Sequence, residues 1–259
     1  MKRLDVLLVQ RQLANSRTHA RKLIDAGRVM VGTGDNWSQA RKASQCIGES
    51  EELRVEPLPE DSYVSRAGVK LAALLDQTGL DPCGWKVLDI GCSTGGFSDC
   101  LLQRGAALVV GVDVGHGQLA PKLQRDPRMH LFEGVNARHL NAEQLAPFGD
   151  EGFDAIVMDV SFISQTLILP RLPALLETGG QLLTLIKPQF EVNPRDIGKG
   201  GLVRDQGLYP QVRDRICALC TSLGLSVQDY IDSPITGGDG NREFLLWAVY
   251  GAGQQTGQG

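Results

Sequence analysis

The chain has 259 residues, of which 42% are hydrophobic and 22% are charged, a balance that suits a soluble protein with one large α/β domain and a smaller one. No apolar run approaches the roughly 18 residues that a membrane span requires, and the charged N-terminus does not have the pattern of a secretory signal. We therefore expect a cytoplasmic protein without membrane contact.

The six cysteines stand mostly in apolar runs, as free thiols in a reducing compartment would. Cys217 and Cys220 form a C-x-x-C motif inside a helical pattern. Because a second pair of ligands is missing, a metal or redox role for this motif is only the minor alternative, and we expect no bound metal.

Positive charge is concentrated at the start of the chain. Residues 1–45 carry nine Lys and Arg against three Asp, a net charge of +6, so the remainder of a chain whose total is −4 carries −10. A basic module joined to an acidic one can contact phosphates although the whole protein is acidic. An ordinary solvated surface is the alternative that charge alone leaves open.

The N-terminal residues predict two helices followed by short strands. Leucines recur at helical spacing over residues 4–13, Ser16 is a typical N-cap of a second helix, and Gly27 stands where that helix should end. Short strands are expected at residues 29–31 and 53–55.

Residues 16–29 follow the pattern S-R-x-x-A-x-x-L-I-x-x-G-x-V. This pattern resembles the αL-type RNA-binding domain of a small-subunit ribosomal protein, of pseudouridine synthases and of tyrosyl-tRNA synthetases. The resemblance covers about the first 55 residues and departs from the family in loop 33–39, where a short Asn-Gly turn is usual. It implies basic side chains that bind RNA phosphates, which gives affinity independent of base sequence. A dimerisation module with incidental charge is the alternative. The expected RNA-binding residues are Arg3, Arg17, Arg21, Lys22 and Arg28.

A Pro-rich acidic stretch, E-P-L-P-E-D, follows this module and reads as a linker. We therefore place an RNA-binding domain at 1–56, a linker at 57–64 and a catalytic domain at 65–250. The Gly/Gln-rich tail 251–259 should be disordered. Beyond the linker, apolar strands alternate with helices, which predicts a Rossmann-like α/β domain whose parallel sheet is covered on both faces.

The strand at residues 86–91, K-V-L-D-I-G, runs into the glycine-rich turn C-S-T-G-G-F. Such a turn between a strand and a helix lets a ligand approach the backbone. The next strand, 108–112, ends at Asp113, whose carboxylate is placed to bind ribose hydroxyls. The spacing G-x-x-x-G-G differs from the G-x-G-x-x-G of nicotinamide dinucleotide sites, so an NAD-dependent enzyme is the weaker alternative.

The segment Leu-Asp-Ile-Gly resembles the first motif of S-adenosylmethionine-dependent methyltransferases, whose cofactor has no pyrophosphate. In that class a polar residue after the third strand contacts the adenine ring of the cofactor. Asn136 is the candidate here, although Asn is also a common turn residue. The expected cofactor-binding residues are Asp89, Gly91, Ser93, Thr94, Gly95, Gly96, Phe97, Asp113 and Asn136.

Two later strands end in charged residues, 153–159 at Asp159 and 181–187 at Lys187. Ligands bind at the carboxyl ends of strands in open α/β folds. A Lys that ends an apolar strand is unusual, and it is desolvated there unless it snorkels to solvent. The pair is therefore a candidate for catalysis, with a purely structural ion pair as the alternative.

Lys70, in S-R-A-G-V-K-L, and Glu243, in G-N-R-E-F-L-L-W, extend this pair to four residues. In order and strand context, the four resemble the Lys-Asp-Lys-Glu tetrad of the FtsJ/RrmJ class of RNA ribose 2′-O-methyltransferases. With the N-terminal module and the segments K-P-Q-F-E and G-K-G-G-L-V-R-D, nearly all of residues 1–250 resembles the TlyA family. Its members are ribosomal RNA cytidine 2′-O-methyltransferases that are often labelled haemolysins. The turn C-S-T-G-G replaces the A-A-P-G-G of FtsJ, which weakens assignments of individual loop contacts.

The resemblance implies a methyltransferase that uses S-adenosylmethionine on ribosomal RNA or ribosomal subunits. Lys187 would be the general base or would orient the proton, Asp159 would tune Lys187 by charge, and Lys70 and Glu243 would position the ribose hydroxyl. A pore-forming haemolysin and a catalytically silent RNA-binding assembly factor are the alternative functions.

Overall fold

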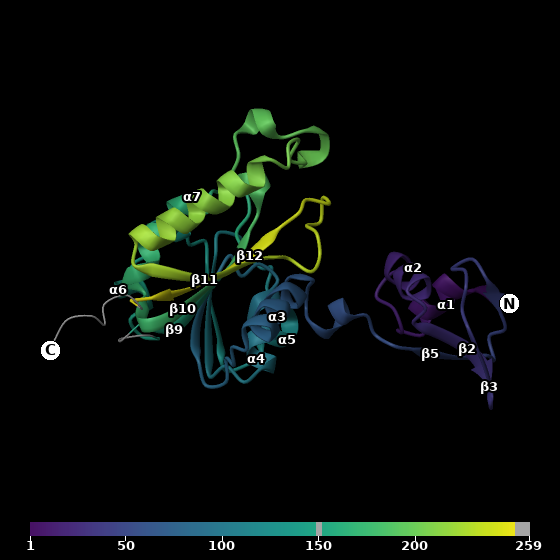
Figure 1. The fold of residues 1–259 in the computed structure, drawn as a ribbon. Coiled ribbons are helices and arrows are strands. Elements are labelled where there is room, and N and C mark those ends of the chain that lie inside the picture. Colours follow the sequence, from purple (N-terminus) through teal and green to yellow (C-terminus); the bar gives the residue numbers. More distant parts are fainter. Residues whose placement is uncertain (149–151, 252–259) are drawn as a thin grey trace. The chain divides into compact units, whose positions relative to one another are not determined.

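The computed structural model describes residues 1–148 and 152–251 (Figure 1). It divides the chain into two compact units, Met1–Ser62 and Tyr63–Gly259. The disorder predicted for the tail concerns residues that, beyond Gly251, lie outside the described part. Within that part, no helix combines the length and the hydrophobicity that crossing a membrane requires.

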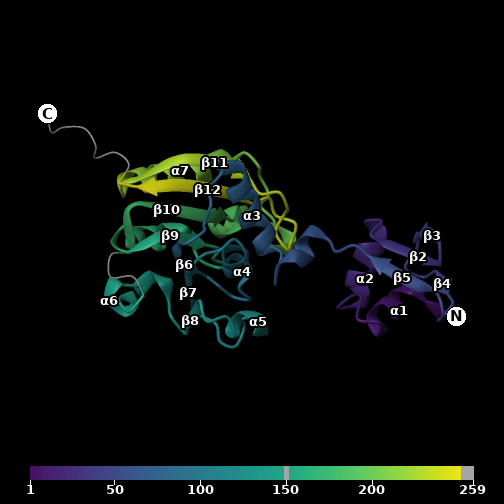
Figure 2. The same cartoon turned by 90° about the horizontal axis from the view of Figure 1, so that it is seen from below.

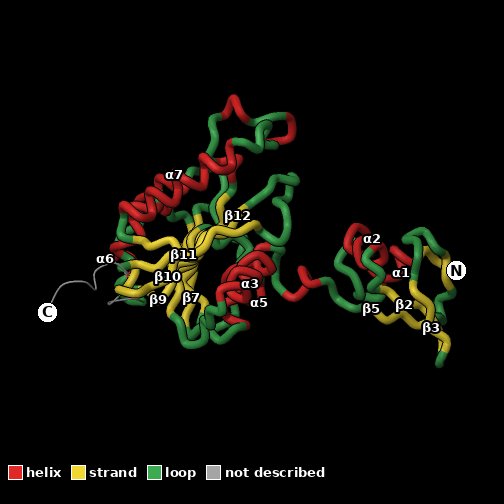
Figure 3. Tube along the Cα trace, in the orientation of Figure 1, coloured by secondary structure: helices red, strands yellow, loops and turns green. Residues whose placement is uncertain are grey.

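The first unit combines two short helices with small antiparallel sheets (Figure 3). The helices are α1 (Leu4–Gln10) and α2 (Arg17–Asp25), and they share one core with the strands. The strands are β1 (Lys2–Arg3), β2 (Val29–Thr33), β3 (Asn36–Gln39), β4 (Cys46–Ile47) and β5 (Glu52–Val55).

The predicted ends of α2 are confirmed. Ser16 accepts a hydrogen bond from the backbone N–H of His19 at 3.1 Å, which satisfies one of the unpaired donors at the helix start. Gly27 has φ 71° just beyond the helix, a left-handed conformation that favours glycine. The two expected strands are present as β2 and β5, whereas β1, β3 and β4 were not expected.

The second unit is built on one seven-stranded sheet in the order β11-β12-β10-β9-β6-β7-β8. Its strands are β6 (Lys86–Ile90), β7 (Leu108–Asp113), β8 (Met129–Glu133), β9 (Phe153–Met158), β10 (Leu176–Ile186), β11 (Leu225–Asp232) and β12 (Phe244–Tyr250). Its α-helices are α3 (Ala67–Thr78), α4 (Gly96–Gln103), α5 (Pro121–Gln124), α6 (Ala142–Leu145) and α7 (Leu208–Ser222).

The Rossmann-like α/β fold is confirmed, with one difference in the direction of a strand. Strands β10, β9, β6, β7 and β8 are parallel, but β12 runs antiparallel to both β10 and β11. The connection from β11 to β12 contains no helix, and a parallel pair needs a crossover connection that is usually helical. The sheet is therefore mixed at the end that carries β11 and β12.

Different helices cover the two faces of the sheet (Figures 1 and 2). One core contains Ile216 of α7, and the other contains Leu71 of α3 and Leu101 of α4. Neighbouring residues of β6 divide between them, with Val87 in the second core and Leu88 in the first. This alternation is the two-residue period of a strand buried on both faces.

The parallel strands end at one edge of the sheet, and the reversed strand β12 begins there. Phe244, the first residue of β12, pairs with Ile186, the last residue of β10. Residues that follow β9 and β10 and residues that precede β12 consequently meet at this edge, which is where ligands bind in open α/β folds.

Candidate functional site

Glycines allow the turn after β6 to pack closely against its neighbours. Gly91 has φ 81°, and a Cβ atom there would lie 2.7 Å from the carbonyl oxygen of Asp159. Gly95 has φ 89°, and a Cβ on Gly96 would lie 2.2 Å from the hydroxyl oxygen of Ser65. The glycine motif thus serves the packing of this turn as well as the approach of a ligand.

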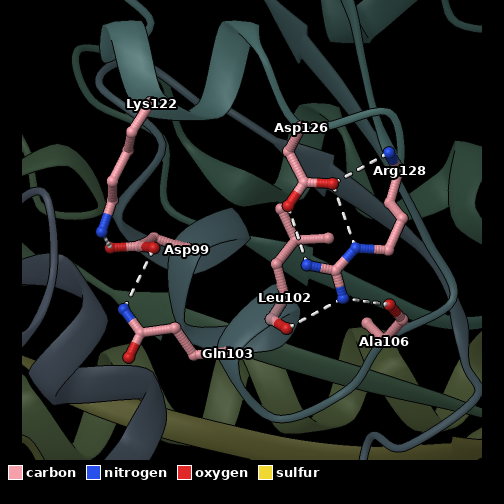
Figure 4. A network of polar contacts seen from close by, with 7 residues as sticks. All are labelled: Asp99, Leu102, Gln103, Ala106, Lys122, Asp126 and Arg128. Carbon is pink, nitrogen blue, oxygen red and sulfur yellow. Dashed lines mark hydrogen bonds and ion pairs between the residues drawn. The ribbon is translucent and has the colours of Figure 1, made fainter.

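Two polar clusters fix α4 and the chain that follows it (Figure 4). Asp99, buried in the first turn of α4, forms an ion pair with Lys122 at 2.8 Å. Arg128 pairs with Asp126 at 2.7 Å and donates a hydrogen bond to the carbonyl oxygen of Leu102 at 3.1 Å. The Arg128 guanidinium also holds the pKa of Asp126 below its usual value. These contacts anchor the helix whose first turn forms the wall of the site.

Two cavities of about 360 and 150 Å³ lie along this turn. Together they reach the size of a small-molecule site. Four residues line both cavities: Gly91, Ser93, Asp159 and Ser161. The larger is also lined by Asp113 and Asn136, and the smaller by Asp89, Thr94, Gly96, Phe97 and Lys187. The structure therefore brings most of the predicted cofactor residues to one place. Gly95 lines neither cavity and is the N-cap of α4, next in sequence to Thr94 and Gly96.

Asp113 accepts hydrogen bonds from the backbone N–H groups of Ser93 at 2.8 Å and Gly115 at 2.7 Å. An ionised carboxylate has about four acceptor positions, so it can still bind hydroxyl groups. Asn136 caps a 3₁₀ helix by accepting from the backbone N–H of Arg138 at 3.0 Å. The candidates for the ribose and the adenine ring therefore line one cavity.

The hydrogen bonds of Asp89 indicate whether the smaller cavity can hold the amino-acid part of the predicted cofactor. One of its oxygens accepts from the backbone N–H and the hydroxyl of Ser98, at 3.1 and 2.5 Å, but its other oxygen is buried without a partner among the described residues. Burial raises the pKa of this carboxyl to about 7, the hydrogen bonds from Ser98 oppose the shift, and the nearby charge of Asp159 adds to it. A buried acceptor without a partner is costly. An ammonium group such as that of S-adenosylmethionine would satisfy it, so the donor set fits.

The four candidate catalytic residues form two ion pairs. Lys187 lies 2.5 Å from Asp159, measured between Nζ and Oδ1, and it donates a hydrogen bond to the hydroxyl of Ser161 at 2.9 Å. Lys70 on α3 pairs with Glu243, and both of these side chains are buried. Lys187 does not snorkel freely to solvent, because only 13% of its side chain is exposed.

Two further residues that line the cavities, Ser161 and Phe162, were not predicted from the sequence. Ser161 follows Asp159 by two positions and accepts a hydrogen bond from Lys187. This contact depends on the shape of the turn after β9, which the sequence pattern does not predict. Phe162 is 92% exposed at the larger cavity, has φ 63°, and lies 5.1 Å from Phe190 between ring centroids. A left-handed conformation is uncommon and costly at a bulky residue, so Phe162 is a further candidate for this site.

In the first unit, three of the predicted phosphate ligands already have carboxylate partners. Arg3 and Arg17 both pair with the buried Asp5, at 3.0 and 2.8 Å, and Arg28 pairs with Glu56 at 2.8 Å. Hydrogen bonds from Arg3 and Arg17 hold the pKa of Asp5 far below its usual value. Arg21 and Lys22 of α2, which are also predicted phosphate ligands, are exposed.

The six cysteines are free thiols, Cys217 and Cys220 among them. Within residues 1–148 and 152–251, no group of three or more His, Cys, Asp or Glu side chains is arranged to hold a metal ion. The C-x-x-C motif is part of α7, where Cys220 is buried and burial raises the pKa of its thiol to about 12.

Comparisons with known proteins match both units. The FtsJ-like methyltransferase family matches residues 63–250, and the S4 domain matches residues 2–33. The 16S/23S rRNA (cytidine-2′-O)-methyltransferase TlyA of Mycobacterium tuberculosis is 39% identical over 95% of this chain and 88% of its own. Hemolysin A of Brachyspira hyodysenteriae is 39% identical over 94% of this chain and 98% of its own. A solved structure from Streptococcus thermophilus, which carries a provisional hemolysin name, has a TM-score of 0.70 and 38% identity over 96% of this chain and 88% of its own.

Proposed function

Because the chain belongs to the FtsJ-like methyltransferase family and to its TlyA group, we propose that it methylates the ribose 2′-oxygen of a cytidine in ribosomal RNA. The chain is an S-adenosylmethionine-dependent methyltransferase, and its S4 domain is an RNA-binding module. The name of the mycobacterial relative supports the choice of cytidine and of ribosomal RNA. The fit of Asp89 and Asp113 to the cofactor supports the chemistry.

The observation that carries the proposal is the Lys187–Asp159 pair in the wall of the cavity that also holds Asp89. S-adenosylmethionine supplies an electrophilic methyl group when it is bound. A ribose hydroxyl is a poor nucleophile at neutral pH, so it must be oriented and must lose its proton. Lys187 would bind that hydroxyl and, as the neutral amine, accept its proton at Nζ, while Asp159 and Ser161 would fix the direction of the amino group.

Lys70 and Glu243 would act as positioning residues. Their ion pair is buried and joins α3 to the start of β12. A Cβ on Gly237 would lie 2.7 Å from a carboxylate oxygen of Glu243, so the loop before β12 also packs against this pair. A buried pair with such close neighbours is rigid, and rigid support of the reacting groups is what orientation requires.

The test is methyl transfer from labelled S-adenosylmethionine to separated small and large ribosomal subunits, followed by mapping of the labelled nucleotide. We expect the label on the ribose of a cytidine. A methyl group on a base, or no transfer to either subunit, would contradict the proposal.

The name of the Brachyspira relative keeps lysis as a second candidate. It would gain support if purified, endotoxin-free protein lysed erythrocytes and if Lys187→Ala lysed them equally well. A silent assembly factor would instead be indicated if Lys187→Ala restored ribosome assembly in cells that lack the protein, while the wild type transferred no methyl group.

A further inference from the structure

A third cavity, of about 320 Å³, lies on the α7 side of the sheet. It is formed by the start of α7, the end of β11 and the start of β12. Asp232 of β11 pairs with Phe244 of β12, which in turn pairs with Ile186, the residue before Lys187. The cavity therefore opens at the same edge of the sheet as the candidate active site, about two strand spacings, or ~10 Å, from the end of β10.

Aromatic rings form one wall of this cavity. The ring of Phe244 lies 5.3 Å from that of Tyr230, nearly stacked at 30°, and 5.5 Å from that of Tyr209, at 66°. The hydroxyl of Tyr230 is buried and has no hydrogen-bond partner within the described part of the chain. The wall thus combines flat apolar surface with a donor that lacks an acceptor.

Arg242 covers this aromatic wall. Its guanidinium lies 5.2 Å above the ring of Phe244 and is held in one plane by two hydrogen bonds to Asp232, at 2.6 and 2.9 Å. Half of the Arg242 side chain is exposed. A second half-exposed guanidinium, that of Arg213, lines the same cavity. The flat faces of guanidinium groups stack on aromatic systems, including nucleobases.

We propose that this cavity binds one unpaired nucleobase of the RNA strand, stacked on the Arg242 guanidinium, close to the nucleotide that is methylated. The inference rests on the proposed function, because it assigns part of the substrate to this place. The volume is that of a small-ligand site. The half-exposed Arg213, which lines the same cavity, offers hydrogen-bond donors to the edge of that base. At the ~3.4 Å rise of a stacked strand, ~10 Å corresponds to about three nucleotides.

The first test measures steady-state methyl transfer to ribosomal subunits by Arg242→Ala and Arg242→Lys. The lysine keeps the positive charge near Asp232 but has no planar group, so a stacking site is lost in both variants. We expect the KM for the subunits to rise roughly 5- to 100-fold, the range of base-stacking contacts, with kcat and cofactor affinity within about twofold of wild type. If the substitutions at Arg242 instead disturbed the neighbouring Glu243, kcat would fall.

Arg125→Ala is the matched control. Arg125 is an exposed arginine at the end of α5, which packs beside β8 at the opposite edge of the sheet. Its removal should leave the KM within about twofold. An equal rise in KM for Arg125→Ala and Arg242→Ala would show that only the loss of positive charge matters, which would contradict a specific base site. Wild-type kinetics for Arg242→Lys would refute stacking.

The second test needs no enzymatic turnover. The Nε–H signal of Arg242 is followed by NMR in the full chain with bound cofactor, while the hexanucleotide rC6, CMP or ribose 5-phosphate is added. We expect rC6 and CMP to shift the signal, rC6 at the lower concentration, and ribose 5-phosphate to have no effect. An equal response to ribose 5-phosphate would identify a phosphate site, and a tighter response to CMP would identify a site for a free nucleotide; either overturns the proposal.

The two tests separate the possible failures. If the wild type transfers no methyl group to ribosomal subunits but rC6 still shifts Arg242, the proposed function fails and the base site stands. If the wild type is active, and neither the variants nor rC6 shows an effect at Arg242, the base site fails alone.

Discussion

At the scale of single residues, Lys187 is the side chain on which the proposed chemistry depends. Lys187→Ala should reduce turnover by about 10²–10⁴-fold, the usual contribution of a general base, because the amine that would accept the hydroxyl proton is then missing. Lys187→Arg should not restore it, since a guanidinium does not accept a proton and has a different reach. Calorimetric titration with S-adenosylmethionine serves as the control and should be unchanged. Retention of more than about a tenth of turnover by Lys187→Ala would make the base assignment wrong.

Asp89 gives a prediction that depends on pH. With a pKa of about 7 in the ligand-free fold, Asp89 is increasingly protonated as the pH falls from 8 to 6, and the neutral form cannot balance an ammonium group. We therefore expect the affinity for S-adenosylmethionine to decrease over that range in the wild type. Asp89→Asn should bind weakly at both pH values. Binding that is independent of pH in the wild type would contradict the assignment of Asp89 to the cofactor ammonium.

The same carboxyl should affect the stability of the ligand-free protein. Its folded pKa lies above the value of about 4 expected for an unfolded chain. The stability that it contributes is thus complete below about pH 4 and is lost as the pH rises through about 7. Asp89→Asn should consequently raise the melting temperature more at pH 8 than at pH 5. The opposite order in thermal melts would show that Asp89 is not a strained buried acid.

At the scale of elements, the turn after β6 joins two strands through a contact that only glycine permits. Gly91→Ala should destabilise the fold by about 1–3 kcal/mol and weaken cofactor binding, because the new methyl group would push against the end of β9 at Asp159. Gly84→Ala is the matched control, since Gly84 also has φ 81° but, in the described part of the chain and apart from its two sequence neighbours, no heavy atom lies within 4 Å of the position of its Cβ. Chemical denaturation should show the larger loss for Gly91→Ala. Equal losses would mean that only backbone strain matters.

The sequence predicted the elements whose pattern is local. Strands such as β6 and β9 are mainly apolar and are followed by a glycine or a charged residue, so both their position and their candidate functional ends could be predicted. The direction of β12 could not, because it depends on which partner the strand finds after a connection without a helix. Charge counting likewise could not show that Arg3 and Arg17 share the carboxylate of Asp5, since α1 and α2 are brought together only by their common core.

At the scale of the whole molecule, the two units have separate cores and should have separable functions. A variant that begins at Tyr63 should bind S-adenosylmethionine like the full chain but should bind ribosomal RNA more weakly. The boundary follows from Leu58, which is buried in the first core, and Asp61, which pairs with His19 at 3.0 Å. Filter binding at several salt concentrations should show a smaller salt dependence for the shortened form, because fewer phosphate contacts release fewer counterions. Undiminished RNA binding would refute the role of the first unit.

The reversed strand β12 also has a consequence for how the enzyme comes into being. The Lys70–Glu243 pair joins residues that are 173 positions apart, and β12 is inserted between β10 and β11 near the end of the chain. During synthesis, which proceeds from the N-terminus, the edge of β10 stays unpaired and the tetrad stays incomplete until the last strand emerges. A chain released before residue 243 would lack the Lys70–Glu243 pair and would expose an open, aggregation-prone strand edge. A copy must therefore be translated through β12 before it can form the complete sheet and the Lys70–Glu243 pair.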